Sequence, residues 1–79
     1  MRLAVYSLRG IEFEGEAKSF NVKTKNGEIT VLENHRPLVT LLSKGCAKIG
    51  LADGGAKDIE INSGFLEVDD RNNLSVLID

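Results

Sequence analysis

The sequence is poor in the residues that build covalent, metal-bound or stacked sites. Its 79 residues include one cysteine, one histidine, one proline and one tyrosine, with three phenylalanines and no tryptophan. A single cysteine cannot form an internal disulfide, which is consistent with a reducing compartment. A structural zinc site takes four cysteine or histidine ligands, and this chain has only two such residues. Burial must therefore hold the fold, and Cys46 is expected to be a small buried residue.

Long apolar runs and a strong charge of one sign are also absent. The chain has nothing like the roughly 18 consecutive apolar residues of a membrane span, and the stretch Leu3 to Leu8 is too short and too polar for a signal peptide. Twelve acidic and ten basic side chains leave a formal net charge of −2. Binding a phosphate backbone requires clustered basic side chains. We therefore expect no nucleic-acid partner and no direct membrane insertion.

Catalytic chemistry has few residues to work with. A nucleophile needs a base within hydrogen-bond reach, and the one candidate pair is Cys46 with His35, on either side of a predicted strand. Their spacing in the sequence does not exclude a catalytic Cys–His pair, which stays open as a minor alternative. The glycines fit neither phosphate-binding glycine motif and stand where turns are expected. We expect no enzymatic activity, no metal and no cofactor.

What the sequence does have is apolar residues at every second position. In Phe20–Thr24, apolar or β-branched residues alternate with polar ones, as in a strand with one buried face. Asn26-Gly27 is typical of a type I′ turn, in which both central residues have positive φ. Ile29 and Val31 resume the alternation. Residues 19–32 are therefore predicted to form a β-hairpin.

Further short strands are predicted along the rest of the chain. The apolar run Leu38–Leu42 is typical of a strand buried on both faces. Alternating or apolar segments follow at residues 46–51, 59–61, 65–68 and 74–78, with turns at 53–55 and 69–73. Strands at this spacing, with no helical periodicity, predict an all-β sandwich or barrel without a helix longer than one turn. The uniform composition indicates one domain, residues 1–79.

The polar segment Glu33-Asn34-His35-Arg36 links two of these predicted strands. One interpretation is a charged connector with no further role. The other is contact with a partner, because polar side chains held between two well-defined strands lose less entropy on docking than the same groups on a mobile loop. From the residues alone, both interpretations stay open.

Three motifs follow one another along the chain. They are Phe13-Glu14-Gly15-Glu16, Gly27 to Leu38, and Ser63 to Val68. They match, in order, Phe/Tyr-x-Gly-Glu, Gly-Glu-apolar-x-apolar-x-Pro-x-His-x-Pro-Leu and apolar-x-x-Gly-Phe-Leu-Glu-Val elements. Taken together over nearly the whole length, the chain resembles the amino-terminal domain of the epsilon subunit of F-type ATP synthases. It departs from that pattern at Glu33, where proline is usual, at Arg36, where a small residue is usual, and at Ser63, where glycine is common.

The resemblance implies a flattened two-sheet β-sandwich of about 8–10 short, mainly antiparallel strands. It also implies a non-catalytic rotor subunit that transmits torque in the central stalk, docked on the gamma subunit and seated on the c-ring of a proton- or sodium-translocating ATP synthase. The family's ring-facing loops correspond to Glu28 and to Asn34, His35 and Arg36. Such a subunit is peripheral, on the cytoplasmic face of a bacterial inner membrane or its organellar equivalent.

Family members usually continue into a two-helix hairpin, to which restraint of ATP hydrolysis and ATP binding are assigned. The sequence given stops at Asp79, at what resembles the strand that ends the domain. We therefore expect these 79 residues neither to inhibit ATP hydrolysis nor to bind ATP.

Two other classes of protein have a comparable size and strand content. A lipoyl or biotinyl carrier domain needs a modifiable lysine at a hairpin tip, but the surroundings of Lys44 and Lys57 fit neither Met-Lys-Met nor Asp-Lys-Ala. An intact mass without an acyl or biotinyl adduct would exclude it. An oligonucleotide-binding barrel needs exposed aromatic residues and a basic groove, and this chain has few aromatic residues. Failure to retard single-stranded DNA at low salt would exclude that class.

Overall fold

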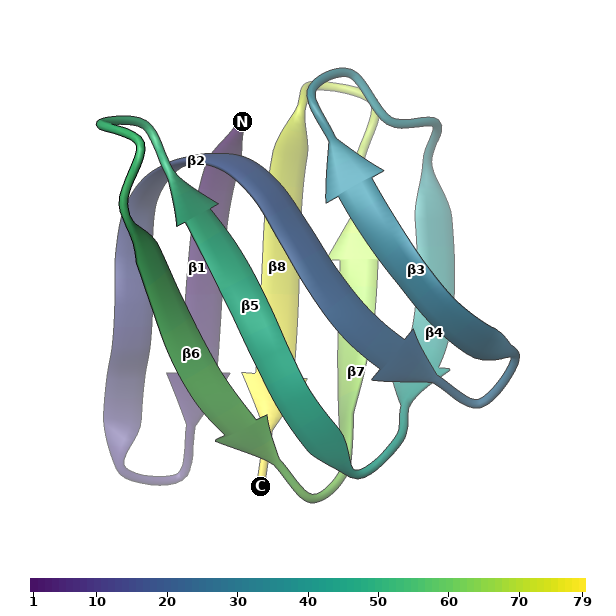
Figure 1. Cartoon of the computed structure of the whole chain (residues 1–79). Coiled ribbons are helices and arrows are strands. Elements are labelled where there is room, and N and C mark those ends of the chain that lie inside the picture. The colour runs from purple at the N-terminus through teal and green to yellow at the C-terminus, as the bar shows by residue number, and fades with distance from the viewer.

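Eight strands contain most of the chain, and there is no helix (Figure 1). The computed structural model describes residues 1–79. The strands are β1 (Arg2–Ser7), β2 (Gly10–Thr24), β3 (Gly27–Leu32), β4 (Leu38–Leu42), β5 (Gly45–Leu51), β6 (Ala56–Ile61), β7 (Gly64–Val68) and β8 (Asn73–Ile78). Every pairing is antiparallel except that of β1 with β8. The prediction of an all-β fold is confirmed.

The strands form two layers, which face each other across the core (Figure 1). Sheet I has the order β6-β5-β2-β3, and sheet II has the order β1-β8-β7-β4, with the first half of β2 beside β1. One contact, between Thr24 and Leu42, also joins β2 to β4. The predicted two-sheet sandwich is therefore present, and its strands number eight.

Strand β2 differs from the short strands that were expected, because it is 15 residues long and belongs to both sheets. Its first half pairs with β1, and its second half pairs with β3 and β5. The register of pairing shifts twice, once opposite the Val5–Tyr6 step of β1 and once between Ala17 and Ser19. Such irregularities bend a strand and increase its twist. They allow β2 to leave one layer and enter the other, as Figure 1 shows.

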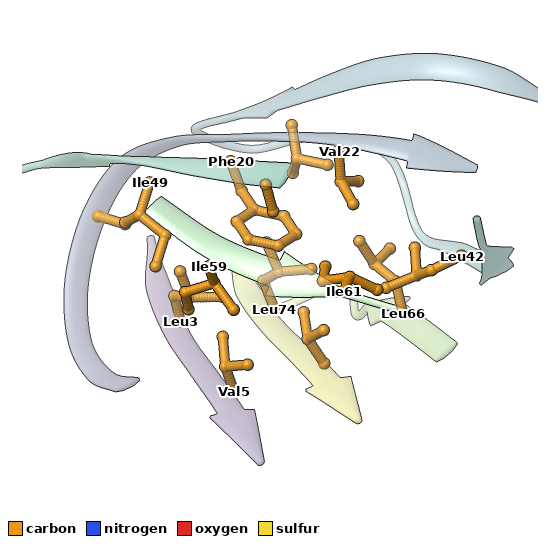
Figure 2. Close-up of a cluster of buried hydrophobic side chains, with 14 of the residues drawn as sticks. Leu3, Val5, Phe20, Val22, Leu42, Ile49, Ile59, Ile61, Leu66 and Leu74 are labelled. Atoms are coloured by element: carbon orange, nitrogen blue, oxygen red, sulfur yellow. The ribbon is translucent and has the colours of Figure 1, made fainter. Parts of the chain in front are cut away.

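The core lies between the sheets and consists of 17 buried apolar residues. Phe20 is its largest fully buried side chain, and Figure 2 shows its ring among leucine, isoleucine and valine side chains from both layers. Each fully buried side chain of this kind stabilises the fold by about 1.5–3 kcal/mol. The inward positions follow the alternation of the sequence: Leu74, Val76 and Ile78 of β8 are all buried.

The hairpin predicted over residues 19–32 is present, but its predicted turn type is wrong. The turn residues are Lys25 and Asn26, between the paired residues Thr24 and Gly27. Gly27 has φ 116°, whereas Asn26 is not among the residues with positive φ. The buried Thr24 hydroxyl accepts a hydrogen bond from Asn26 N at 3.1 Å and donates one to Gly27 O at 2.6 Å. The Thr24 hydroxyl thus stabilises the turn, which does not have type I′ geometry.

Two predictions of burial are also wrong. Strand β4 was expected to be buried on both faces, yet Val39 and Leu41 are exposed. A sandwich of two layers covers each sheet on one side only, so half of the side chains of β4 face outward. Cys46 was expected to be buried, but it lies on the outer face of β5 and is exposed.

Candidate functional site

The four residues proposed as partner contacts lie at the two ends of β3. Figure 1 shows the N-terminus and the β3–β4, β5–β6 and β7–β8 connections at the upper end of the sandwich, with the C-terminus and the other turns at the lower end. Glu28 lies next to the β2–β3 turn, at the lower end, where it pairs with Lys23. Asn34, His35 and Arg36 follow β3 at the upper end. The structure therefore does not gather them into one cluster.

The upper-end loop is tied down by contacts to distant parts of the chain. Glu33 accepts hydrogen bonds from the N-terminal ammonium of Met1 and, at 2.7 Å, from Asn72 Nδ2. Asn34 N donates to Asn72 Oδ1 at 2.8 Å. Both asparagines adopt positive φ, 60° for Asn34 and 63° for Asn72, a conformation that asparagine tolerates better than most residues. These contacts join the β3–β4 loop to the β7–β8 turn and to the start of β1.

The loop also limits the freedom of His35. The His35 backbone N–H donates to Leu32 O at 3.2 Å, and its Nδ1 lies 2.7 Å from Arg36 O. His35 is half-buried, whereas Asn34 and Arg36 are exposed. A held imidazole flanked by two exposed polar side chains can contact a partner with little loss of conformational freedom.

Two carboxyl groups at the upper end, those of Glu33 and Asp69, have lowered pKa values. Hydrogen bonds from the N-terminal ammonium and then from Asn72 hold the pKa of Glu33 below its ordinary value. In the β7–β8 turn, the backbone N–H groups of Arg71 and Asn73 donate to Asp69 at 2.8 and 3.0 Å and lower its pKa. Hydrogen bonds to a carboxylate favour its charged form. Both groups therefore act as structural anions that fix turns.

At the lower end, Glu28 lies on the exposed outer face of sheet I. Its carboxylate accepts a hydrogen bond from Asn21 Nδ2 at 3.1 Å, and the same amide lies 2.8 Å from Thr30 Oγ1. Asn21 thus links β2 to β3 beside Glu28. Since β3 pairs only with β2, its other edge is free, and Glu28 stands at the lower end of that edge.

The arrangement offers binding groups and no catalytic set. Cys46 and His35 lie at opposite ends of the sandwich, so the minor alternative of a Cys–His pair is excluded by position (Figure 1). No group of three or more histidine, cysteine, aspartate or glutamate side chains is placed to hold a metal ion. The structure also contains no helix of the length and apolarity that a bilayer crossing requires.

Sequence reasoning missed one exposed feature of sheet II. Leu41, Phe65 and Leu77 point outward from neighbouring strands. A signal was present in the sequence, because Leu38–Leu42 and Val76–Ile78 are apolar at consecutive positions, including those that alternate outward. These runs indicated apolar residues on both faces of a strand, and only one face is covered.

The sequence was compared with models of protein families and with the sequences of known proteins. The family model described as ATP synthase, Delta/Epsilon chain, beta-sandwich domain matches residues 1–79. The chain is 32% identical over 77 residues to the ATP synthase epsilon chain of a Sulfurovum species, covering 98% of this chain and 60% of that one. It is 33% identical over 79 residues to the ATP synthase epsilon chain of a Nitratiruptor species, covering 100% of this chain and 60% of the other. The chain thus spans about 60% of the length of these relatives.

The fold also has a close match among solved structures. A chain in the cryo-EM structure of the Euglena gracilis mitochondrial ATP synthase, OSCP/F1/c-ring, superposes with a TM-score of 0.90 and 22% identity, covering 96% of this chain and 48% of that chain. The resemblance drawn from the three sequence motifs is confirmed. The comparisons give no support to the carrier-domain alternative.

Proposed function

The chain belongs to the family of the ATP synthase delta/epsilon chain β-sandwich domain, and we propose that it serves as a non-catalytic subunit of the central stalk of an F-type ATP synthase. In this role it joins the gamma subunit to the c-ring and contributes to coupling and assembly. The observation that carries the proposal is the family match over residues 1–79, together with relatives named ATP synthase epsilon chain. A closed β-core with no assembled catalytic groups supports a structural role.

The ring contact is proposed for the side of the sandwich that β3 borders. Glu28 and His35 lie at opposite ends of this strand, so a compact site at one end would include only one of them. If the free edge of β3 runs along the polar loops of the ring, both ends reach it at once. Glu28 then contributes the lower contact, and Asn34, His35 and Arg36 the upper contacts. Through these partners the subunit is peripheral to the membrane, on the cytoplasmic face in bacteria or its organellar equivalent.

The test measures binding to the gamma subunit and binding to the c-ring separately. The double variant Glu28→Gln and His35→Ala should keep its binding to the cognate gamma subunit and lose affinity for a gamma–c-ring assembly. We expect about a tenfold weaker docking to the ring, the loss typical of two exposed polar contacts. The matched control is Glu60→Gln, an exposed carboxylate on β6 at the opposite edge of sheet I.

Co-purification with each assembly gives the readout, and circular dichroism checks the fold of each variant. Loss of gamma binding in a folded double variant would show that the β3 side contacts gamma, contrary to the proposal. Failure of the unchanged chain to bind either partner would overturn the rotor role itself.

A further inference from the structure

Only two residues other than glycine adopt positive φ, and a hydrogen bond joins them. They are Asn34 in the β3–β4 loop and Asn72 in the β7–β8 turn. Asn34 N donates to Asn72 Oδ1 at 2.8 Å, across 38 positions of the sequence. A residue persists in such a conformation only where its surroundings determine it, and these residues gather at ligand clamps and active sites. The pair is therefore a candidate functional device.

The Asn72 side chain uses both ends of its amide to hold the β3–β4 loop. Its Oδ1 accepts the hydrogen bond from Asn34 N, and its Nδ2 donates to the Glu33 carboxylate at 2.7 Å. The other oxygen of Glu33 accepts a hydrogen bond from the ammonium of Met1, which is part of the core. Two successive loop residues are thus fixed from a turn distant in sequence. The two hydrogen bonds made by Asn72 are called the Asn72 clamp below.

The turn that contains Asn72 is itself fixed. Asp69 Oδ1 accepts hydrogen bonds from the backbone N–H groups of Arg71 and Asn73, the residues on either side of Asn72. Arg2 N donates to Asn72 O at 3.1 Å, which ties the turn to the start of β1. Precise positioning requires that the supporting residues are themselves locked by hydrogen bonds and packing. The β7–β8 turn therefore gives the Asn72 clamp a fixed base at the upper end of the sandwich (Figure 1).

The Asn72 clamp ends one residue before His35, the single histidine of the chain. The Nδ1 of His35 lies 2.7 Å from Arg36 O. A carbonyl oxygen can only accept, so Nδ1 carries the proton, and in the neutral ring Nε2 is left as an acceptor. The loop therefore presents a hydrogen-bond acceptor at Nε2, and a complementary partner surface has a hydroxyl, an amide or a basic side chain.

We propose that Asn72 is a positioning residue, which fixes the β3–β4 loop so that Nε2 of His35 meets a hydrogen-bond donor on the c-ring. This role rests on the proposed function, in which the loop contacts the ring. A flexible loop loses conformational entropy when it docks, and that loss weakens binding. With the Asn72 clamp, the loop is ordered on folding, before the ring is met.

The first test removes the Asn72 clamp and keeps the turn. Asn72→Gly suits this purpose, because glycine adopts positive φ without strain. We expect docking on a gamma–c-ring assembly to weaken about fivefold, the loss typical of a lost hydrogen bond. Binding to the gamma subunit alone should change by less than about twofold. The matched control is Asn62→Gly, the same change at an exposed asparagine in the β6–β7 turn at the lower end.

Two measurements on the free chain report the Asn72 clamp without a partner. Hydrogen exchange of the Asn34 amide should become about fivefold faster in Asn72→Gly, because that N–H loses its acceptor. Nitrogen NMR of the His35 imidazole should shift from the Nδ1–H tautomer toward a mixture of both tautomers. The chain has one histidine, so the signal is unambiguous. Asn62→Gly should change neither measurement.

An exchange of donor and acceptor tests the Asn72 clamp by rescue. Asn72→Asp keeps an acceptor for Asn34 N but places a carboxylate against that of Glu33, so docking on the ring should weaken at least as much as in Asn72→Gly. Adding Glu33→Gln supplies an amide donor at position 33 and restores the total charge of the unchanged chain. The double variant should recover ring affinity to within about twofold of the unchanged chain.

The outcomes separate the Asn72 clamp from the proposed function. Circular dichroism checks the fold of each variant. Unchanged exchange and tautomer in Asn72→Gly would show that the clamp does not hold the loop. Faster exchange with normal docking on the ring would overturn the positioning role, and so would a folded double variant that recovers no affinity. Failure of the unchanged chain to dock on the ring would overturn the proposed function and the positioning role together, while exchange and NMR would show whether the clamp exists.

Discussion

The two outer faces of the sandwich differ although the inner faces are built alike. On sheet I the outward side chains include Asn21, whose amide donates hydrogen bonds to Thr30 and Glu28, and Lys48, which is paired across β5 and β6 with Asp58. On sheet II they include Leu41, Phe65 and Leu77, which are apolar and exposed. Folding requires only the inward residues to be apolar. Folding alone therefore does not account for the contrast between the outer faces.

The largest expected effect is a loss of stability, and it tests whether the two sheets share one core. Phe20→Ala removes the largest fully buried side chain, which lies between the two sheets. We expect the free energy of unfolding to fall by about 3–5 kcal/mol, a large share of the stability of a domain of this size. Urea denaturation measures it. Retention of one sheet's hydrogen-exchange protection after loss of the other would show that the sheets are separate units.

A second phenylalanine gives the contrast with the core. Phe65 points outward from β7, so Phe65→Ala should lower the free energy of unfolding by less than about 1 kcal/mol, the size of a cross-strand contact. Urea denaturation of Phe65→Ala beside Phe20→Ala measures the difference. A stability loss as large as that of Phe20→Ala would mean that the sheet II face is part of the core.

A change on the polar outer face of sheet I should have an effect on stability of similar size. Asn21→Ala removes the amide that contacts Thr30 and Glu28, so we expect a stability loss of about 0.5–1.5 kcal/mol. Urea denaturation provides the measurement. An unchanged free energy of unfolding in Asn21→Ala would show that these hydrogen bonds contribute nothing to stability.

The smallest effect concerns the upper end of the sandwich, which belongs to neither face. Glu33 and Asp69 have pKa values below their ordinary values of 4.5 and 3.8, owing to the hydrogen bonds they accept. A lowered folded-state pKa means that the stabilisation is present above the unfolded pKa and is lost as the pH falls through the folded pKa. Acid should therefore loosen the β3–β4 loop and the β7–β8 turn.

The variant Glu33→Gln should remove part of this acid sensitivity. Its urea midpoint should decline less than that of the unchanged chain between about pH 5 and about pH 2, the range in which such carboxyls titrate. Glu60→Gln is the control, because that exposed carboxylate accepts no hydrogen bond. An acid response identical in the unchanged chain and in Glu33→Gln would show that the ion pair with the N-terminus contributes nothing.

The local pattern of the sequence predicted the strands well. Alternation identified the β2–β3 hairpin and the inward residues of β8, because each depends on neighbours in sequence. Burial on the second face of β4 could not be judged that way, since Val39 and Leu41 are exposed only because no third layer exists. The exposure of Cys46 follows from the same cause.

The candidate sites were predictable only in part. The polar loop at Asn34–Arg36 was recognised from its sequence, and its contact role stays a prediction. The alignment of Leu41, Phe65 and Leu77 on the outer face depends on the register of three strands, which alternation does not reveal. The ion pair that holds Glu33 depends on Met1 and Asn72, residues distant in sequence. Contacts of this kind require the assembled fold.

The length of β2 has a mechanical consequence. Its backbone runs without a break from sheet II into sheet I and is bonded to β1 at one end and to β3 and β5 at the other. A force applied to one side of the sandwich therefore reaches the other through covalent bonds, rather than only through sliding contacts between apolar side chains. Shearing the two layers past each other would strain this common strand, so the domain should behave as one stiff body under load.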